Sequence, residues 1–179
     1  MLLSGKIALI TGGSKGLGRA ISLAYAREGA AVITCSRDPA SLKNVEKELS
    51  GITSSYLVIP ADVSKLEEVR RLVSETVSRF RRVDILVNNA SLLGPRVAIT
   101  DYPEEDWRAV LDANLFGVFL LSREVARIMM DQRDGSIINL SSSVGRRGRA
   151  RWGAYAVSKF GLEGLTQVLA DELKPYNTL

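Results

Sequence analysis

Lys6-Ile-Ala-Leu-Ile-Thr-Gly-Gly-Ser-Lys-Gly-Leu-Gly18 is the stretch of sequence that decides the fold. Its first half, Lys6–Thr11, is a short apolar run that predicts a strand buried on both faces. The glycines that follow, at positions 12, 16 and 18, let backbone amides approach a pyrophosphate at the positive end of the next helix. A tight strand-to-helix turn also uses glycine, but the position after the first strand favours dinucleotide binding.

Apolar runs alternate with amphipathic segments along the rest of the chain. Between the runs, apolar residues recur at helical spacing, for example at Val69, Val73 and Val77. Strict alternation of strand and helix implies right-handed crossovers and a doubly wound parallel α/β sheet. No linker or repeat interrupts this pattern, so residues 1–179 are expected to form one domain. The further predicted strands are Ala31–Ser36, Ser55–Ile59, Asp84–Asn88 and Ser136–Leu140.

The composition excludes several classes of site. The 179 residues contain no histidine and a single cysteine, Cys35. Zinc sites of the His/Cys type, histidine-based catalytic triads and a disulfide framework within the chain are therefore ruled out. The N-terminus does not resemble a signal peptide, and no apolar run approaches the ~18 residues of a membrane span. We expect a cytoplasmic protein with no membrane segment.

The net charge of +4 and the pI of about 9.4 raise the question of nucleic-acid binding. Most basic residues are scattered among acidic ones, and no nucleic-acid motif is present. The aromatic residues are not interleaved with the basic ones as in a stacking platform. Nucleic-acid binding is therefore only a minor alternative, and a small-molecule partner is expected.

The end of the second predicted strand bears on the choice between NAD and NADP. An acidic residue there would bind the ribose 2′-hydroxyl and repel a 2′-phosphate. This strand ends instead in Ser36-Arg37, and Lys15 lies in the glycine loop, so two cations suit a 2′-phosphate. Asp38 is the rival signal, although Asp followed by Pro39 is ordinary helix capping. The charge pattern favours NADP over NAD.

Polar residues also follow the third and fourth predicted strands. Asp62, before Val63, could accept a hydrogen bond from the adenine amino group or could equally cap the next helix. Asn88-Asn-Ala-Ser91 ends the fourth strand beside the topological switch point, where ligands bind in such sheets. Its amides could pin neighbouring backbone or the cofactor, or form a plain turn.

Tyr155-Ala-Val-Ser-Lys159 places a phenol and an ammonium one helical turn apart on the same face. A tyrosine normally titrates near ~10, and a neighbouring ammonium makes its proton easier to lose by stabilising the phenolate. Such a pair can serve as a general acid/base. The pair alone is weak evidence, because many exposed helix faces carry the same spacing by chance.

Two further polar residues strengthen the interpretation. Asn114 sits within an apolar helical stripe that includes Val110 and Val118. A buried amide without partners costs about 1–3 kcal/mol, so a bound water or a local helix distortion is expected to supply them. Ser142 lies in Asn139-Leu-Ser-Ser-Ser-Val-Gly145, at the end of the fifth strand, and precedes Tyr155 by thirteen residues.

Taken together, these motifs resemble the short-chain dehydrogenase/reductase family, and they occur in the family's order from about Gly5 to Pro175. The resemblance implies a Rossmann-type sheet with strand order 3-2-1-4-5 and hydride transfer between NADP(H) and a carbonyl or alcohol, of the ketone or 3-oxoacyl type. It implies that Tyr155 is the general acid/base and that Ser142 hydrogen-bonds the substrate carbonyl. Lys159 would bind the nicotinamide ribose, and Asn114 would hold a water of the proton relay. The cofactor-binding residues that the resemblance implies are Gly12, Ser14, Lys15, Gly16, Leu17, Gly18, Ser36, Arg37, Asp62, Val63, Asn88, Asn89, Ala90, Tyr155 and Lys159.

The chain departs from the family pattern in two places. Ser91 stands where the family usually has glycine. The sequence also stops at Tyr176-Asn-Thr-Leu179, so the family's last two strands and its substrate-covering lid are expected to be missing. Ile137, Ile138 and Leu140 would then form a bare apolar edge. The alternatives are a non-catalytic NADP-binding or scaffold protein and an inactive truncated fragment.

Two surfaces are expected to meet partners. The long predicted helices Glu104–Met130 and Trp152–Lys174 form a helical interface in the family, which implies a homodimer or homotetramer. Leu162, Leu165 and Leu169 are expected to serve both the sheet and the partner. The arginine-rich loop Arg146–Trp152 would border the site and attract an anionic substrate, or would simply be solvated.

Overall fold

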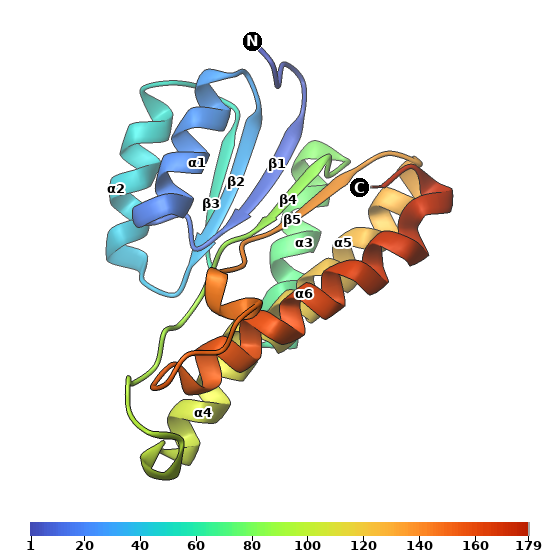
Figure 1. Cartoon of the computed structure of the whole chain (residues 1–179). Helices are drawn as coiled ribbons and strands as arrows, with labels where there is room; N and C mark the ends of the chain where they lie inside the picture. The colour runs from blue at the N-terminus through green and yellow to red at the C-terminus, as the bar shows by residue number, and fades with distance from the viewer. Residues whose placement is uncertain (179) are drawn as a thin grey trace.

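The computed structural model describes residues 1–178 and contains a five-stranded parallel sheet with strand order β3-β2-β1-β4-β5 (Figure 1). The predicted strand order is therefore confirmed. Each strand begins and ends within one residue of its predicted bounds. The strands are β1 (Ile7–Thr11), β2 (Ala31–Ser36), β3 (Tyr56–Pro60), β4 (Ile85–Asn88) and β5 (Ser136–Asn139).

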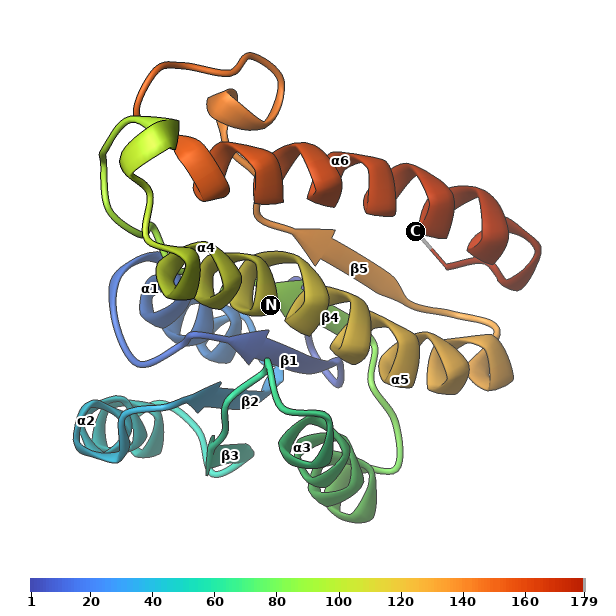
Figure 2. The same ribbon diagram turned by 90° about the horizontal axis from the view of Figure 1, so that it is seen from below.

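Helices cover both faces of the sheet. The helices are α1 (Gly16–Arg27), α2 (Pro39–Ser50), α3 (Leu66–Phe80), α4 (Glu104–Leu111), α5 (Gly117–Gln132) and α6 (Gly153–Leu173). Helices α1 and α2 lie on one face, and α3, α5 and α6 lie on the other (Figures 1 and 2). Helix α4 extends beyond the end of the sheet at which the glycine loop lies (Figure 1). The sheet is thus buried on both sides, as parallel sheets require.

The strand β1 shows how the core is divided. Ala8 and Ile10 point to the layer of α1 and α2, whereas Leu9 points to the layer of α3 and α5. All three side chains are fully buried. Two separate apolar cores therefore hold β1 in the centre of the sheet, which fixes the position of the glycine loop at its end.

The long helix predicted over Glu104–Met130 is interrupted. Residues Asp112–Phe116 form a π-helical segment between α4 and α5, in which backbone hydrogen bonds span five residues instead of four. The predicted helix is therefore present, and it contains a π-helical distortion within its length. The distortion that the buried Asn114 amide was expected to need is present at that residue.

The edge strand β5 is partly open. Ile138 is 40% exposed, whereas Ile137 and Leu140 are half-buried. Thr178 forms an isolated parallel bridge with Gly135 beside this edge, at the place where a further strand was expected to begin. Within residues 1–178, none of the helices is both long and apolar enough to cross a bilayer.

Candidate functional site

The glycine loop is fastened to the end of β4. The Asn89 side-chain amide donates to the carbonyl oxygens of Thr11 (2.9 Å) and Gly12 (3.2 Å). In return, the Thr11 hydroxyl accepts from the backbone amides of Asn89 and Ala90, both at 3.0 Å. The sequence left open whether this amide binds neighbouring backbone or the cofactor. The structure shows that it binds neighbouring backbone. The loop after β1 and the end of β4 are therefore held in a fixed relative position.

Glycine is required at two positions of the loop by close backbone contact. A Cβ on Gly18 would lie 2.4 Å from the Gly12 carbonyl oxygen, and a Cβ on Gly12 would lie 2.9 Å from Ala90 Cα. Gly12 also has a φ of +66° and Gly16 a φ of +54°. At Gly16 nothing lies within 4 Å of the missing Cβ, so the loop presents bare backbone to open space. This arrangement fits a pyrophosphate at the start of α1.

A cavity of about 600 Å³ opens beside the glycine loop, at the carboxyl ends of β1, β2, β3 and β4. Ten of the residues assigned to the cofactor line it: Gly12, Ser14, Lys15, Leu17, Ser36, Arg37, Asp62, Val63, Asn89 and Ala90. Gly16, Gly18, Asn88, Tyr155 and Lys159 are not among its lining residues. The cavity thus covers the glycine loop and the ends of these four strands, and it does not extend to the helix that carries Tyr155.

The charged end of the cavity contains Lys15, Arg37 and Asp38. Within residues 1–178, neither cation has a carboxylate within 4 Å. Asp38 is the N-cap of α2 and accepts from the Ala40 amide at 3.0 Å, with Pro39 in the first turn. Hydrogen bonds from the Ser41 hydroxyl and the Ala40 amide lower the pKa of Asp38. The Asp38 carboxylate, which was the rival signal for NAD, therefore caps α2, as predicted.

Asp62 is held by its own turn. Its carboxylate accepts from the Ser64 amide (3.0 Å) and the Ser64 hydroxyl (2.8 Å), and its amide donates to Glu68 at 2.9 Å. The N-cap of α3 is Lys65, so the Asp62 carboxylate does not cap that helix directly. Asp62 lines the cavity as well, and its position remains compatible with contact to an adenine.

The Asn88 side chain is bound within the protein. Its amide nitrogen donates to the Ser122 hydroxyl (3.0 Å) on α5 and to Asn139 Oδ1 (2.9 Å) on β5. Asn139 in turn donates to the Thr166 hydroxyl on α6 at 2.9 Å. The side chain of Asn88 therefore joins the two strands to the helices behind them and is 3% exposed.

Asn114 has partners for its whole amide. Its Oδ1 accepts from the Leu92 amide at 2.7 Å, and its Nδ2 donates to the Leu92 carbonyl oxygen (2.8 Å) and the Ser158 hydroxyl (3.1 Å). Ser158 also donates to the Tyr155 carbonyl oxygen at 2.7 Å. The partners expected for this buried amide are thus protein groups, and they connect the π-helical segment to the helix turn that carries Tyr155.

Tyr155 and Lys159 lie one turn apart near the start of α6. The Lys159 ammonium lies 5.5 Å from the centroid of the Tyr155 ring and donates to the Leu140 carbonyl oxygen at 2.7 Å. Lys159 is only 3% exposed, and burial lowers its pKa to about 8. The ammonium is therefore held in a poorly solvated place beside the phenol ring.

The segment after β5 brings Ser142 to the same helix. Ser142 caps a short 3-10 turn, Ser143–Gly145, and its hydroxyl accepts from the Val144 amide at 3.4 Å. A Cβ on Gly145 would lie 2.9 Å from the Lys159 carbonyl oxygen, so this turn packs directly against α6. The structure thus brings Ser142, Tyr155, Lys159 and Asn114 together around the first turns of α6.

Sequence reasoning missed two residues of this region, Ser158 and Trp152. Ser158 is fully buried and joins Asn114 to Tyr155, and a serine inside the Tyr/Lys turn was the available signal. The Trp152 ring lies 5.8 Å from the Tyr155 ring, centroid to centroid. Trp152 precedes Tyr155 by three residues in the predicted helix, and this i, i+3 spacing was the available signal.

The sequence profile of the short chain dehydrogenase family matches residues 6–178. The chain belongs to this family. A similar relative of this short-chain dehydrogenase is the 3-oxoacyl-[acyl-carrier-protein] reductase FabG of Thermotoga maritima, which is 38% identical over 177 residues. That match covers 99% of this chain and 72% of the relative.

Two solved structures of the short-chain dehydrogenase fold are close in shape and differ in their cofactor. NAD⁺-bound xylitol dehydrogenase matches with a TM-score of 0.97 and 32% identity, over 99% of this chain and 68% of that one. A metagenomic short-chain oxidoreductase in complex with NADP matches with a TM-score of 0.94 and 32% identity, over 99% and 80%. Likeness of fold alone therefore leaves both cofactors open, and the residues of this chain must decide between them.

Proposed function

We propose that this short-chain dehydrogenase is an NADP-dependent reductase of ketone or 3-oxoacyl carbonyl groups. The observation that carries the proposal is the packing of Tyr155, Lys159 and the turn capped by Ser142 against one another at the start of α6. The similarity to a 3-oxoacyl reductase supports the substrate type. The bound nicotinamide would supply the hydride, or take it up in the reverse direction.

The residues at α6 are assigned separate roles. Ser142 donates a hydrogen bond to the substrate carbonyl oxygen and holds it near the phenol. Tyr155 gives its proton to that oxygen as negative charge develops there. The Lys159 ammonium stabilises the resulting phenolate and binds the nicotinamide ribose. The hydrogen bonds of Asn114 hold the π-helical segment against α6, and water beside Asn114 is proposed to return the proton.

The choice of NADP rests on charge. Lys15 and Arg37 line one end of the cavity without a carboxylate partner in the described chain, whereas the Asp38 carboxylate is engaged at the start of α2. A 2′-phosphate would give both cations a partner through charge-assisted hydrogen bonds.

A direct assay tests the proposal. The protein is mixed with NADPH and neutral ketones or 3-oxo esters, and the loss of NADPH is followed by absorbance together with formation of the alcohol. We expect one molecule of alcohol to form for each molecule of NADPH that is consumed. Saturable NADPH binding without alcohol formation from any of these carbonyls would instead indicate a non-catalytic NADP-binding or scaffold protein.

We also propose a homo-oligomer built on α5 and α6, which lie side by side (Figure 2). Of the three leucines expected to serve both the sheet and a partner, Leu162 is buried within the chain, and Leu165 and Leu169 are half-buried. The apolar residues that these helices and the π-helical segment expose are Phe116, Phe119, Val157, Phe160 and Val168, each between 38% and 54% exposed. An apolar group of this kind marks an interface.

Light scattering at tens of micromolar protein tests this interface. We expect the mass of a dimer or tetramer, and Phe160→Glu is expected to lower the mass to that of one chain, because burying the new carboxylate is costly. Ile99→Glu, at an exposed apolar residue outside these helices, serves as the control and should leave the mass unchanged. A single-chain mass for the unmodified protein contradicts the proposal.

A further inference from the structure

A stacking contact joins the arginine-rich loop before α6 to the segment that follows β4. The Arg96 guanidinium carbon lies 4.4 Å from the centroid of the Trp152 ring. Arg96 belongs to the segment between β4 and α4, whereas Trp152 ends the arginine-rich loop. Two segments that are far apart in the sequence therefore meet through a cation and an aromatic face.

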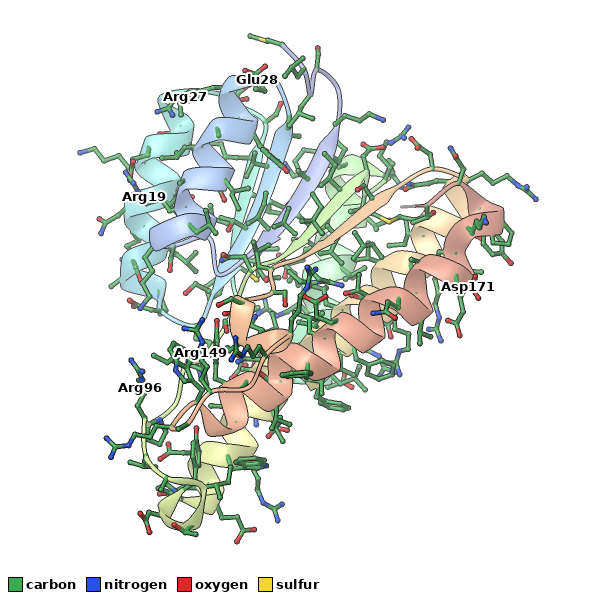
Figure 3. The ribbon with its side chains drawn as sticks, viewed as in Figure 1. Arg19, Arg27, Glu28, Arg96, Arg149 and Asp171 are labelled. Carbon is green, nitrogen blue, oxygen red and sulfur yellow. The ribbon has the colours of Figure 1, made fainter. Side chains whose placement is uncertain are left out.

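This contact continues to the proposed catalytic residue. The Trp152 ring lies 5.8 Å from the Tyr155 ring, so the Arg96 guanidinium carbon is within about 10 Å of the Tyr155 ring centroid. The Trp152 amide also donates to the Arg149 carbonyl oxygen at 3.2 Å, which places Arg149 in the same turn. Figure 3 shows Arg96 and Arg149 on the same side of the molecule, beside the start of α6.

The charges of this loop are not equivalent. Arg146 lies 3.4 Å from Glu163 on α6, so its charge is offset within the protein. For Arg96, and for Arg147, Arg149 and Arg151 of the loop, no carboxylate lies within 4 Å in the part of the chain that the structure describes. Arg149 differs from the other two because its carbonyl oxygen accepts from the Trp152 amide. A loop whose arginines were present only to balance acidic neighbours would pair them, as Arg146 is paired.

We propose that Arg96 and Arg149 form a subsite that binds a carboxylate or phosphate group of the carbonyl substrate, with Trp152 holding Arg96 in place. This inference rests on the proposed function and names its substrate class. The substrate is an oxo acid, or a phosphate ester of an oxo compound, whose anionic group is separated from the reacting carbonyl by several bonds. Guanidinium groups suit both anions because they offer paired donors in one plane.

The test uses straight-chain methyl-ketone carboxylates of increasing length, each compared with its own methyl ester. The ketone is the same in both, so only the negative charge differs. We expect kcat/KM for the longer acids to exceed that for their esters by roughly tenfold or more, since a charge-assisted contact is lost in the ester. Added salt should reduce this advantage by screening. A series of phosphate esters of hydroxy-ketones distinguishes phosphate from carboxylate as the preferred group.

Variants assign the effect to the two residues. Arg96→Gln and Arg149→Gln should each lower kcat/KM for the acid much more than kcat/KM for the ester, so that most of the preference for the acid is lost. Arg79→Gln is the matched control, because the Arg79 guanidinium also lies over an aromatic ring, Phe80, at 5.5 Å and belongs to α3. This variant should change kcat/KM for neither the acid nor the ester. Equal kinetics for acid and ester in the parent protein, or variants that affect both alike, would overturn the subsite.

A binding measurement separates this inference from the proposed reaction. In a Trp107→Phe background Trp152 is the only tryptophan, and its fluorescence is titrated with an alkyl carboxylate that contains no ketone. We expect a saturable change that Arg96→Gln abolishes. If ketone reduction is absent but this change occurs, the proposed function fails and the anion subsite stands. If no saturable change occurs while the ketones are reduced without regard to charge, the subsite fails and the reaction stands.

Discussion

Tyr155→Phe is expected to lower kcat for ketone reduction by roughly 10²–10⁴-fold, the usual contribution of a general acid/base. Only the phenolic oxygen is removed, so the ring keeps its contacts with Trp152 and with the Lys159 ammonium. Because Tyr155 does not line the cavity, the Kd for NADPH should change by no more than about threefold. Steady-state kinetics and a fluorescence titration with NADPH measure the two quantities.

Tyr25→Phe provides the matched control for this variant. Tyr25 is a partly buried residue of α1 that packs against the core on the other face of the sheet. The same chemical change there should leave kcat within about twofold. Turnover by Tyr155→Phe that approaches the parent value at any pH would show that another group moves the proton.

Arg37→Asp is expected to reverse the cofactor preference. In the parent protein NADPH should bind more tightly than NADH, because Lys15 and Arg37 both face the cavity. The variant loses a charge-assisted contact and places a carboxylate where the 2′-phosphate would lie. The ratio of the two Kd values should therefore change by roughly 100-fold or more, given about 1.5–3 kcal/mol for each such contact.

Lys43→Asp controls for the change of charge in this part of the molecule. Lys43 is an exposed residue of α2 that does not line the cavity, and its replacement should leave the ratio nearly unchanged. Equal affinities for NADPH and NADH in the parent protein would rule out the assignment of Lys15 and Arg37 to the 2′-phosphate.

The sheet was predictable because its signals are local and repeat along the chain. Each strand is a short apolar run, and helical spacing fills each interval, so alternation alone predicts a parallel sheet. The strand order came from the family resemblance. The glycine loop was predictable for a similar reason, since the need for bare backbone at Gly12 and Gly18 leaves a direct mark in the sequence.

The contacts around α6 were only partly predictable. The sequence indicated that the Asn114 amide needs partners, but Leu92 and Ser158 are 22 and 44 residues away, and no periodic pattern connects them. A local helix distortion at Asn114 was one of the two expected outcomes, but its form as a π-helical segment was not predicted. The stacking of Arg96 on Trp152 joins two loops, which carry no periodic signal at all.

The exposed residues of the helical surface were not predicted, for a different reason. Helical spacing groups apolar residues into stripes, and α6 carries more than one stripe. Leu162 turns into the protein, Leu165 and Leu169 are half-buried, and Val157 and Phe160 are exposed. Which stripe meets the sheet depends on the angle at which α6 crosses it, and that angle is set by tertiary packing rather than by the helix itself.

The hydrogen bonds of Asn114 also couple ligand binding in the cavity to the ordering of the helix turn that carries Tyr155. Leu92 lines the cavity and is joined to Asn114 by two hydrogen bonds, while Ser158 joins Asn114 to the helix turn of Tyr155. A ligand that orders the Leu92 backbone therefore lowers the entropy that must be lost to order that turn. Thermodynamic linkage makes this coupling free energy the same in both directions. A substitution that loosens the turn at Tyr155 consequently weakens binding in a cavity it does not touch.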